Sequence, residues 1–113
     1  MFGLFKKDLS EISDLKGESF KQSFEDAMDA RLIDVRSTRE FQTGHLPDAI
    51  HLELGSSAFR EAISNWETSL PIYIYCRSGR RSMMAARSFA KKGFSNVVNL
   101  QGGILEWPYR ITK

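Results

Sequence analysis

Cysteine is almost absent from this sequence, and its scarcity limits the chemistry that the chain can perform. The 113 residues include a single cysteine, Cys76. One cysteine excludes an intramolecular disulfide, a Cys-x-x-Cys redox pair and a thiolate-rich zinc site. Cys76 is therefore expected to be either a buried core thiol or a lone nucleophile, in reducing surroundings.

Long hydrophobic runs are absent as well. No apolar stretch approaches the roughly 18 residues that a membrane span requires. Residues 1–7 also lack the apolar core of a secretory signal. These absences predict a soluble, cytoplasmic protein without a membrane partner.

Neither sign of charge dominates the chain. Sixteen lysines and arginines stand against fourteen aspartates and glutamates, which leaves a net charge of +2. So small a surplus does not predict a nucleic-acid partner. The bias is local, because Arg77, Arg80 and Arg81 follow closely after Cys76.

Short apolar runs alternate with helical patterns along the chain. Strands are predicted near residues 32–35, 72–75 and 97–100, and helices near residues 23–28, 37–43, 56–66, 80–92 and 104–107. This alternation predicts one α/β domain with a mainly parallel central sheet and helices on both faces. We expect the domain to span residues 19–113, after an N-terminal arm of residues 1–18 with a helical turn around Ser10 to Leu15.

Capping residues mark the ends of several predicted helices. Ser23 is a candidate cap for the first helix, and Ser37 followed by Glu40 is the pattern of a capping box. Gly44 and Gly93 are expected to end the helices that precede them. The helix at residues 80–92 is predicted to bury four side chains, Met83, Met84, Ala86 and Phe89.

Cys76 lies where the strand at residues 72–75 gives way to the helix at residues 80–92. In a tight turn of this kind, backbone N–H groups and the helix N-terminus favour a negative charge on the sulfur. The nearby arginines add positive charge. The placement predicts a thiolate nucleophile rather than a core thiol.

The residues after Cys76 are candidates for binding an anionic substrate. Guanidinium groups hold oxyanions through paired N–H donors, so one or two of the arginines are expected to contact the substrate. Ser78 can donate a hydrogen bond, and Ser82 either donates one or caps the helix. Gly79 is expected to allow a backbone conformation that turns N–H groups toward the sulfur. The candidate set is Arg77, Ser78, Gly79, Arg80, Arg81 and Ser82.

A second polar group follows the strand at residues 32–35 and is expected to support the site, because the carboxyl ends of parallel strands meet at one edge of a sheet. Arg36 and Glu40 are four residues apart and are predicted to form an ion pair. Asp34 is expected to accept backbone N–H bonds. His45 is interpreted as a packed, hydrogen-bonded turn residue rather than a general base.

Three segments, in this order, resemble the rhodanese family of sulfurtransferases. They are Leu-Ile-Asp-Val-Arg at residues 32–36 with Glu40-Phe41 and Gly-His-Leu-Pro-Asp-Ala at residues 44–49, then Tyr-Cys-Arg-Ser-Gly-Arg-Arg-Ser at residues 75–82, then Leu-Gln-Gly-Gly-Ile at residues 100–104 with Trp107. The resemblance covers about residues 19–107. Asp48 departs from the glycine that many relatives carry, a change in a turn outside the proposed chemistry.

The resemblance implies a single-domain thiosulfate sulfurtransferase that works by double displacement. The Cys76 thiolate would take a sulfur atom from a small anionic donor such as thiosulfate and hold it as a persulfide. The acceptor would be cyanide, a thiol or the cysteine of a sulfur-acceptor protein. The scheme requires no metal and no organic cofactor.

Two other functions are alternatives. Cysteine phosphatases and arsenate reductases also surround a cysteine with N–H groups, but the phosphatases that share this fold need Cys-x5-Arg. Position 82 is Ser82, and Arg81 gives Cys-x4-Arg instead. A non-catalytic binding or regulatory module is the other alternative, and it would require a blocked loop around Cys76.

Overall fold

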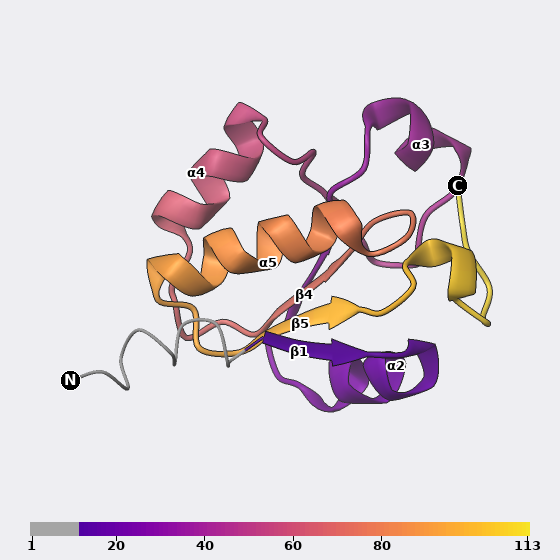
Figure 1. Ribbon diagram of the computed structural model, residues 1–113, viewed down its shortest axis with the longest axis horizontal. Coiled ribbons are helices and arrows are strands. Elements are labelled where there is room, and N and C mark those ends of the chain that lie inside the picture. Colours follow the sequence, from indigo (N-terminus) through magenta and orange to yellow (C-terminus); the bar gives the residue numbers. More distant parts are fainter. Residues whose placement is uncertain (1–11) are drawn as a thin grey trace.

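A five-stranded parallel sheet forms the centre of the protein (Figure 1). The computed structural model describes residues 12–113. The strands are β1 (Ile12–Leu15), β2 (Arg31–Asp34), β3 (Ile50–His51), β4 (Ile72–Tyr75) and β5 (Val97–Leu100). Their order across the sheet is β1-β5-β4-β2-β3, and every pair of neighbours is parallel. The predicted parallel sheet is confirmed.

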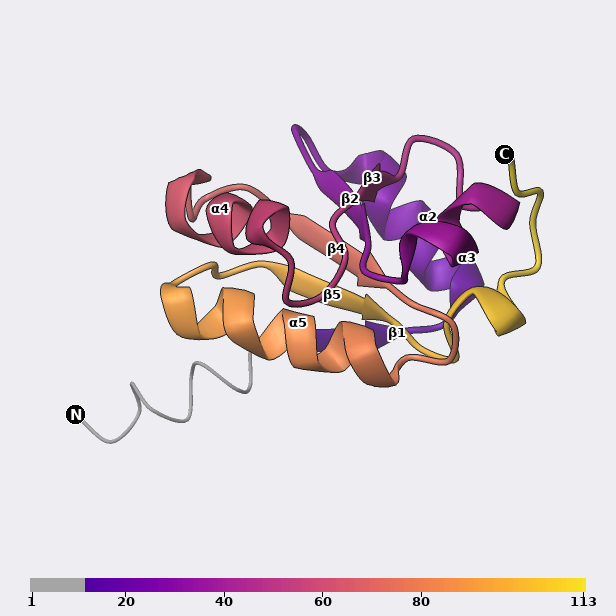
Figure 2. The ribbon, with the colours of Figure 1, turned by 90° about the horizontal axis from the view of Figure 1, so that it is seen from above.

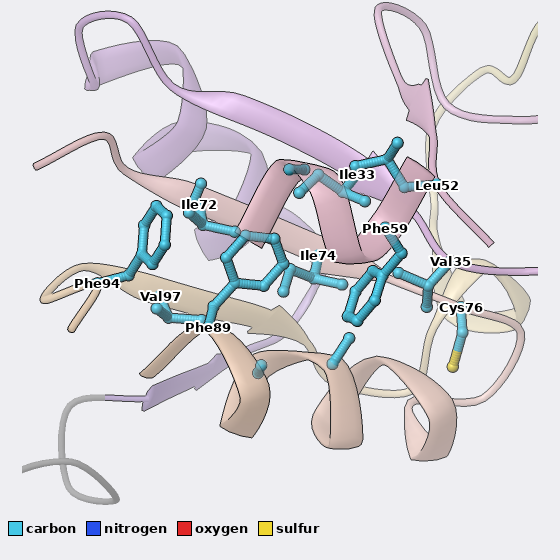
Figure 3. Close-up of a cluster of buried hydrophobic side chains, with 13 residues drawn as sticks. Ile33, Val35, Leu52, Phe59, Ile72, Ile74, Cys76, Phe89, Phe94 and Val97 are labelled. Carbon is cyan, nitrogen blue, oxygen red and sulfur yellow. The ribbon is translucent and has the colours of Figure 1, made fainter. Parts of the chain in front are cut away.

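Helices cover both faces of this sheet (Figure 2). They are α2 (Gly17–Asp26), α3 (Thr38–Thr43), α4 (Ser57–Asn65), α5 (Arg80–Lys92) and the short 3₁₀ helix η1 (Ile104–Glu106). On one face, Phe59 of α4 and Phe89 of α5 share a buried cluster with Ile74 of β4 (Figure 3). On the other face, Phe20 of α2 packs edge-on against Tyr73 of the same strand. The two clusters confirm the predicted α/β architecture.

β4 is the central strand and is buried along its whole length. Its isoleucines join the cluster under α4 and α5, and its tyrosines join the cluster under α2, because side chains alternate along a strand. A strand covered on both faces is apolar throughout, as the sequence of β4 is. Tyr75 of β4 pairs in register with Asp34 of β2, so the segments that follow the two strands leave the sheet at the same edge.

The capping residues lie where the sequence places them in two helices. Ser37 Oγ accepts the backbone N–H of Glu40 at 3.2 Å, and Glu40 Oε1 accepts the backbone N–H of Ser37 at 2.9 Å, which completes the capping box of α3. Gly44 follows α3 directly. Gly93 ends α5 with a left-handed φ of 112°. These predictions are confirmed.

The N-terminal part of the described chain differs from the prediction. Residues 12–15, expected in a helical turn, form β1 and pair in parallel with β5. α2 begins at Gly17, so Ser23 lies inside the helix, where its hydroxyl forms a hydrogen bond with Tyr73 Oη at 2.6 Å instead of capping. Residues 12–18 of the expected arm therefore contain β1 and the start of α2, and its remaining part, residues 1–11, lies outside the described residues.

One predicted core residue of α5 is wrong. Met84 is 56% exposed, whereas Ala86 and Phe89 are buried and Met83 is half-buried against the core. The inward face of α5 passes through small residues, including Ala85 and Ala90, which let the helix lie close to the sheet. Met84 consequently points outward.

Candidate active site

Cys76 follows β4 at the carboxyl edge of the sheet, at the base of the loop that leads into α5 (Figure 3). Three donors converge on its sulfur. The backbone nitrogen of Gly79 lies 3.1 Å from Sγ, and the backbone nitrogen and hydroxyl of Ser82 lie at 3.4 and 3.3 Å. A thiol that only fills core space needs no such donors. The arrangement favours the thiolate, and it shows that Ser82 donates to sulfur rather than capping α5.

These hydrogen bonds lower the pKa of Cys76. The residue is 1% exposed, and this burial by itself raises the pKa of the thiol. Donation by the Ser82 hydroxyl, and by the backbone N–H groups of Ser82, Gly79 and Ser78, outweighs burial, so the net pKa lies below the ordinary value of 9.0. More of Cys76 is therefore thiolate at neutral pH than in an unperturbed cysteine.

Gly79 makes this arrangement possible. It occupies the cap position of α5 with φ of 106° and ψ of −9°, a left-handed conformation that residues with a Cβ rarely adopt. In this conformation its N–H points at Cys76 Sγ. The role predicted for Gly79 is confirmed.

The loop packs closely against the segment that follows β5, a contact that the sequence did not predict. The backbone N–H of Ile104 donates to the carbonyl of Cys76 at 2.9 Å, and that of Leu105 donates to the carbonyl of Arg77 at 3.2 Å. Gly103 is so close that a Cβ there would lie 2.3 Å from the Arg77 carbonyl oxygen. Figure 1 shows this segment, which includes η1, beside the loop. The glycine pair at residues 102–103 was the only sequence signal for this support.

Arg81 is held by a carboxylate. Its guanidinium donates to both oxygens of Glu40, at 2.8 and 3.0 Å, and so joins the first turn of α5 to α3. Arg81 holds the pKa of Glu40 down to about 2, with help from the backbone and hydroxyl of Ser37. Glu40 raises the pKa of Arg81 the most, and the charge of Cys76 raises it further. The guanidinium of Arg81 therefore also interacts electrostatically with the sulfur of Cys76. The predicted ion pair between Arg36 and Glu40 is wrong, because Glu40 pairs with Arg81.

Arg36 instead pairs with Asp34 inside the protein. Arg36 Nε lies 3.0 Å from Oδ1 of Asp34 and Nη2 lies 2.7 Å from Oδ2, while Nη2 also donates to the carbonyl of Gly44 at 2.6 Å. Asp34 accepts the backbone N–H of Arg36 at 2.9 Å, as expected, and the hydroxyl of Tyr75 at 2.6 Å. The network ties the ends of β2 and β4 together. Tyr75 in turn accepts the backbone N–H of Leu46 at 3.0 Å.

His45 lies in the turn after α3 as a packed residue. Its Nδ1 is 2.9 Å from the carbonyl oxygen of Leu46, and its ring stacks on Phe41 with centroids 3.9 Å apart. Its backbone exchanges two hydrogen bonds with Thr112. This placement matches the interpretation of His45 as a turn residue.

Arg77, Ser78 and Arg80 form the exposed rim of the loop. Between residues 12 and 113, neither Arg77 nor Arg80 has a carboxylate oxygen within 4.0 Å. Arg80 also stands in the first turn of α5, which contains no acidic residue. A helix dipole disfavours cations at that end. The position of Arg80 therefore does not serve helix stability, and it suits the binding of an anion beside Cys76.

The protein-family model described as "Rhodanese-like domain" matches residues 17–108 of this chain. The chain belongs to the rhodanese-like domain family. The fold agrees, because a solved structure described as reduced Bacillus anthracis CoADR-RHD superposes with a TM-score of 0.76 at 27% identity, over 92% of this chain and 18% of that one.

Curated relatives of this rhodanese-like domain have sulfur-transfer names. It is 34% identical over 96 residues to "Sulfurtransferase" of Allochromatium vinosum, which covers 85% of this chain and 88% of the relative. It is also 37% identical over 101 residues to "Putative sulfur carrier protein YrkF" of Bacillus subtilis (strain 168). This alignment covers 89% of this chain but only 54%, about half, of that relative. It is 36% identical over 78 residues to "Thiosulfate sulfurtransferase GlpE" of Pseudomonas savastanoi pv. phaseolicola, 69% and 72% of the two chains. These names support a rhodanese-type role in sulfur transfer.

Outside the loop, residues 12–113 contain a cavity but no metal-binding cluster. A cavity of about 260 Å³ lies beside α2, lined by residues such as Phe24, Leu46 and Trp107, on the opposite face of the sheet from the cluster that contains Cys76. Within residues 12–113, no three His, Cys, Asp or Glu side chains gather as a metal site would require. In the same range, no helix is both long and apolar enough to cross a membrane.

We expect Ser82→Ala to raise the pKa of Cys76, because the variant removes the hydroxyl hydrogen bond that contributes most to lowering that pKa. Alkylation by iodoacetamide reports this change, since only the thiolate reacts and the rate climbs as pH passes through the pKa. The midpoint of Ser82→Ala should lie at higher pH than that of the wild type. The control is Ser88→Ala on the same helix, whose hydroxyl bonds the carbonyl of Met84. Identical midpoints in all three proteins would show that the Ser82 hydroxyl does not stabilise the thiolate.

Proposed function

We propose that this rhodanese-like domain is a thiosulfate sulfurtransferase that carries the transferred sulfur on Cys76 as a persulfide. The observation that carries the proposal is the convergence of one hydroxyl and two backbone N–H groups on the sulfur of Cys76. The names of the relatives support sulfur transfer. Thiosulfate as the donor, and cyanide or a thiol as the acceptor, are the finer parts of the proposal.

In the first step, the Cys76 thiolate attacks the outer sulfur of thiosulfate. A bond forms between the two sulfur atoms, the S–S bond of thiosulfate breaks, and sulfite leaves with its electron pair. The enzyme is left with a persulfide on Cys76, and the donors of Gly79 and Ser82 stabilise the Sγ thiolate that attacks and is later regenerated. Cys76 is almost completely buried, which suits a small donor.

In the second step, a nucleophilic acceptor attacks the outer sulfur of the persulfide. The bond between the outer sulfur and Cys76 Sγ breaks, and the thiolate recovers its electron pair. Cyanide would leave as thiocyanate, and a thiol would leave as a persulfide. No net oxidation is needed, because the donor supplies the sulfur at the required oxidation level.

The arginines are proposed to divide two tasks. Arg77 and Arg80, at the exposed rim, bind the sulfonate end of the donor through paired N–H groups. Arg81, bound to Glu40, holds the loop against α3 and adds positive charge near the sulfur. Asp34, Arg36 and His45 support the loop from the neighbouring strand and turn.

The intact mass of the protein tests the proposal. We expect incubation with thiosulfate to add one sulfur atom to the wild-type protein, and subsequent addition of cyanide to remove it with release of thiocyanate. The gain in mass must persist after excess thiosulfate is removed, because a persulfide is covalent. Absence of any gain with thiosulfate, and with an organic persulfide as a second donor, would contradict the proposed function.

Arg80→Ala is expected to raise the KM for thiosulfate about tenfold, which corresponds to about 1.4 kcal/mol of lost binding. The physical reason is the loss of an unpaired guanidinium at the mouth of the loop. Steady-state kinetics with thiosulfate should be compared with kinetics on an uncharged organic trisulfide, for which the variant should resemble the wild type. Equal losses on both donors would assign Arg80 a structural role instead.

A further inference from the structure

α5 has an unusual distribution of charge. Its thirteen residues include five cations and no acidic residue. The cations at its C-terminal end, Lys91 and Lys92, are favoured by the helix dipole, but Arg80 and Arg81 at its N-terminal end are not. Glu40 compensates Arg81. Stability of the helix therefore does not explain why the helix is so uniformly basic.

Four of the exposed residues of α5 form one stripe. They recur at the spacing of a single helix face, i, i+4, i+7 and i+11. They are Arg80, Met84, Arg87 and Lys91, and all four are exposed. Figure 1 shows α5 lying across the sheet, with its N-terminal end at the loop of Cys76. The stripe thus starts at the mouth of the proposed active site and runs away from it.

Two large apolar side chains are exposed at this same end of the molecule. Met84 is 56% exposed in the middle of the cationic stripe, and Leu105 is 60% exposed. The backbone of Leu105 bonds to the carbonyl of Arg77, so this residue adjoins the rim of the loop. Methionine and arginine are both enriched in surfaces that contact other proteins, so Met84 between Arg80 and Arg87 fits such a surface.

We propose that the α5 stripe docks an acidic segment of the protein that accepts sulfur from Cys76. Carboxylates of that segment pair with Arg87 and Lys91, and an apolar side chain covers Met84. This contact brings a cysteine of the partner to the mouth of the loop, beside Arg80. The inference rests on the proposed function of Cys76 as a sulfur carrier.

The transfer that this docking serves balances without a further reactant. The partner's cysteine attacks as a thiolate on the outer sulfur of the Cys76 persulfide. The bond between the two sulfur atoms of the persulfide breaks, the electron pair stays on Cys76 Sγ, and the partner leaves with the persulfide. Docking raises the local concentration of the attacking thiolate and orients it.

A protein fits the stripe better than a nucleic acid does. A phosphate backbone is bound by cations and polar hydrogen-bond donors, whereas Met84 interrupts the stripe with an exposed apolar surface. The net charge of the chain is only +2, so the molecule as a whole has little attraction for a polyanion. Attraction of an acidic partner would mainly increase the rate of encounter and would weaken as salt is added.

The test uses the persulfide form of the full protein and two synthetic peptides, each with one cysteine and one leucine. One peptide carries several glutamates, and the other carries lysines in their place. We expect transfer to the acidic peptide to be about tenfold faster at low ionic strength, with the difference disappearing in high salt. The double variant Arg87→Glu with Lys91→Glu should lose this preference, and Met84→Ser should reduce it.

The control is Lys92→Glu, which reverses one charge on the same helix but outside the stripe and should keep the preference, and Arg87→Glu and Lys91→Glu are also compared with it singly. All variants should load sulfur from thiosulfate and pass it to cyanide at the wild-type rate. Equal transfer to both peptides would overturn the docking surface while leaving the proposed function intact. Failure to load sulfur in the wild type would instead contradict the proposed function itself. Tighter binding of a single-stranded oligonucleotide than of the acidic peptide would also overturn the proposal.

Discussion

Cys76→Ser is expected to abolish sulfur transfer, by at least about 10³-fold, while the protein remains folded. The hydroxyl of serine is far more weakly acidic than a thiol, so no charged nucleophile forms at neutral pH even beside the donors of Gly79 and Ser82. Serine is close to cysteine in size and can accept the same hydrogen bonds. The measurement is thiocyanate release together with intact mass after thiosulfate.

Two controls make this result interpretable. A thermal unfolding curve of Cys76→Ser should lie within a few degrees of the wild type, since only a small volume is lost from the core. Ser88→Ala, a change at an exposed position of α5, should retain sulfur loading. Turnover by Cys76→Ser at the wild-type rate would rule out the persulfide mechanism.

Much of the fold follows from local sequence signals. β4 is an uninterrupted apolar run of four residues, and its burial on both faces matches that composition. The ends of α3 and α5 were predictable because a capping box and a left-handed glycine act within one turn of the helix. In these two helices the capping residues and the groups they bond are neighbours in sequence, and the prediction was therefore successful.

β1 was missed because its stability depends on a distant segment. Its residues read Ile-Ser-Asp-Leu, and the two central ones are exposed, so the segment is not apolar enough to be predicted as a strand. It becomes a strand by pairing with β5, from Ile12 with Val97 to Leu15 with Leu100. The side chain of Asn99 also donates to Asp14 at 2.9 Å. Such long-range pairing has no counterpart in local propensity.

The site shows the same contrast. The cysteine, the glycine that shapes the loop and the serine that donates to sulfur lie within seven residues of chain. The ion-pair partner of Glu40 could not be predicted from neighbouring residues. Arg36 is near in sequence, but the actual partner, Arg81, lies 41 residues away. Arg36 instead forms its ion pair with Asp34, which is only two residues away and fully buried. Competition between possible partners was decided by the packing of β2 against β4.

The position of Ser82 also bears on the phosphatase alternative. A Cys-x5-Arg loop would place an arginine there, but Ser82 is 0% exposed and its hydroxyl donates to Cys76 Sγ. The loop is therefore built around a sulfur atom, and it lacks the arginine that would hold phosphate.

Gly103→Ala is expected to reduce sulfur transfer by about 10²-fold, the order of loss that follows when a reacting group is displaced by about 1 Å. Gly103 has φ of 65° and ψ of −164°, a region that only glycine adopts readily. An added Cβ would also lie 2.3 Å from the carbonyl oxygen of Arg77 and 2.6 Å from the nitrogen of Ser78. These are backbone atoms of the loop itself, so the loop must shift, which displaces its donors from Cys76 Sγ.

Gly55→Ala is the matched control, because Gly55 also has a left-handed φ, of 82°, but nothing lies within 4 Å of its Cβ position. Both variants lose free energy of unfolding through backbone strain, by about 1–3 kcal/mol. Only Gly103→Ala should in addition raise the pKa of Cys76 in the alkylation assay, since it alone separates the sulfur from the N–H groups that lower that pKa. If the two variants lost equal stability and both kept the wild-type alkylation profile, the segment after β5 would be a scaffold of the fold without influence on the thiolate.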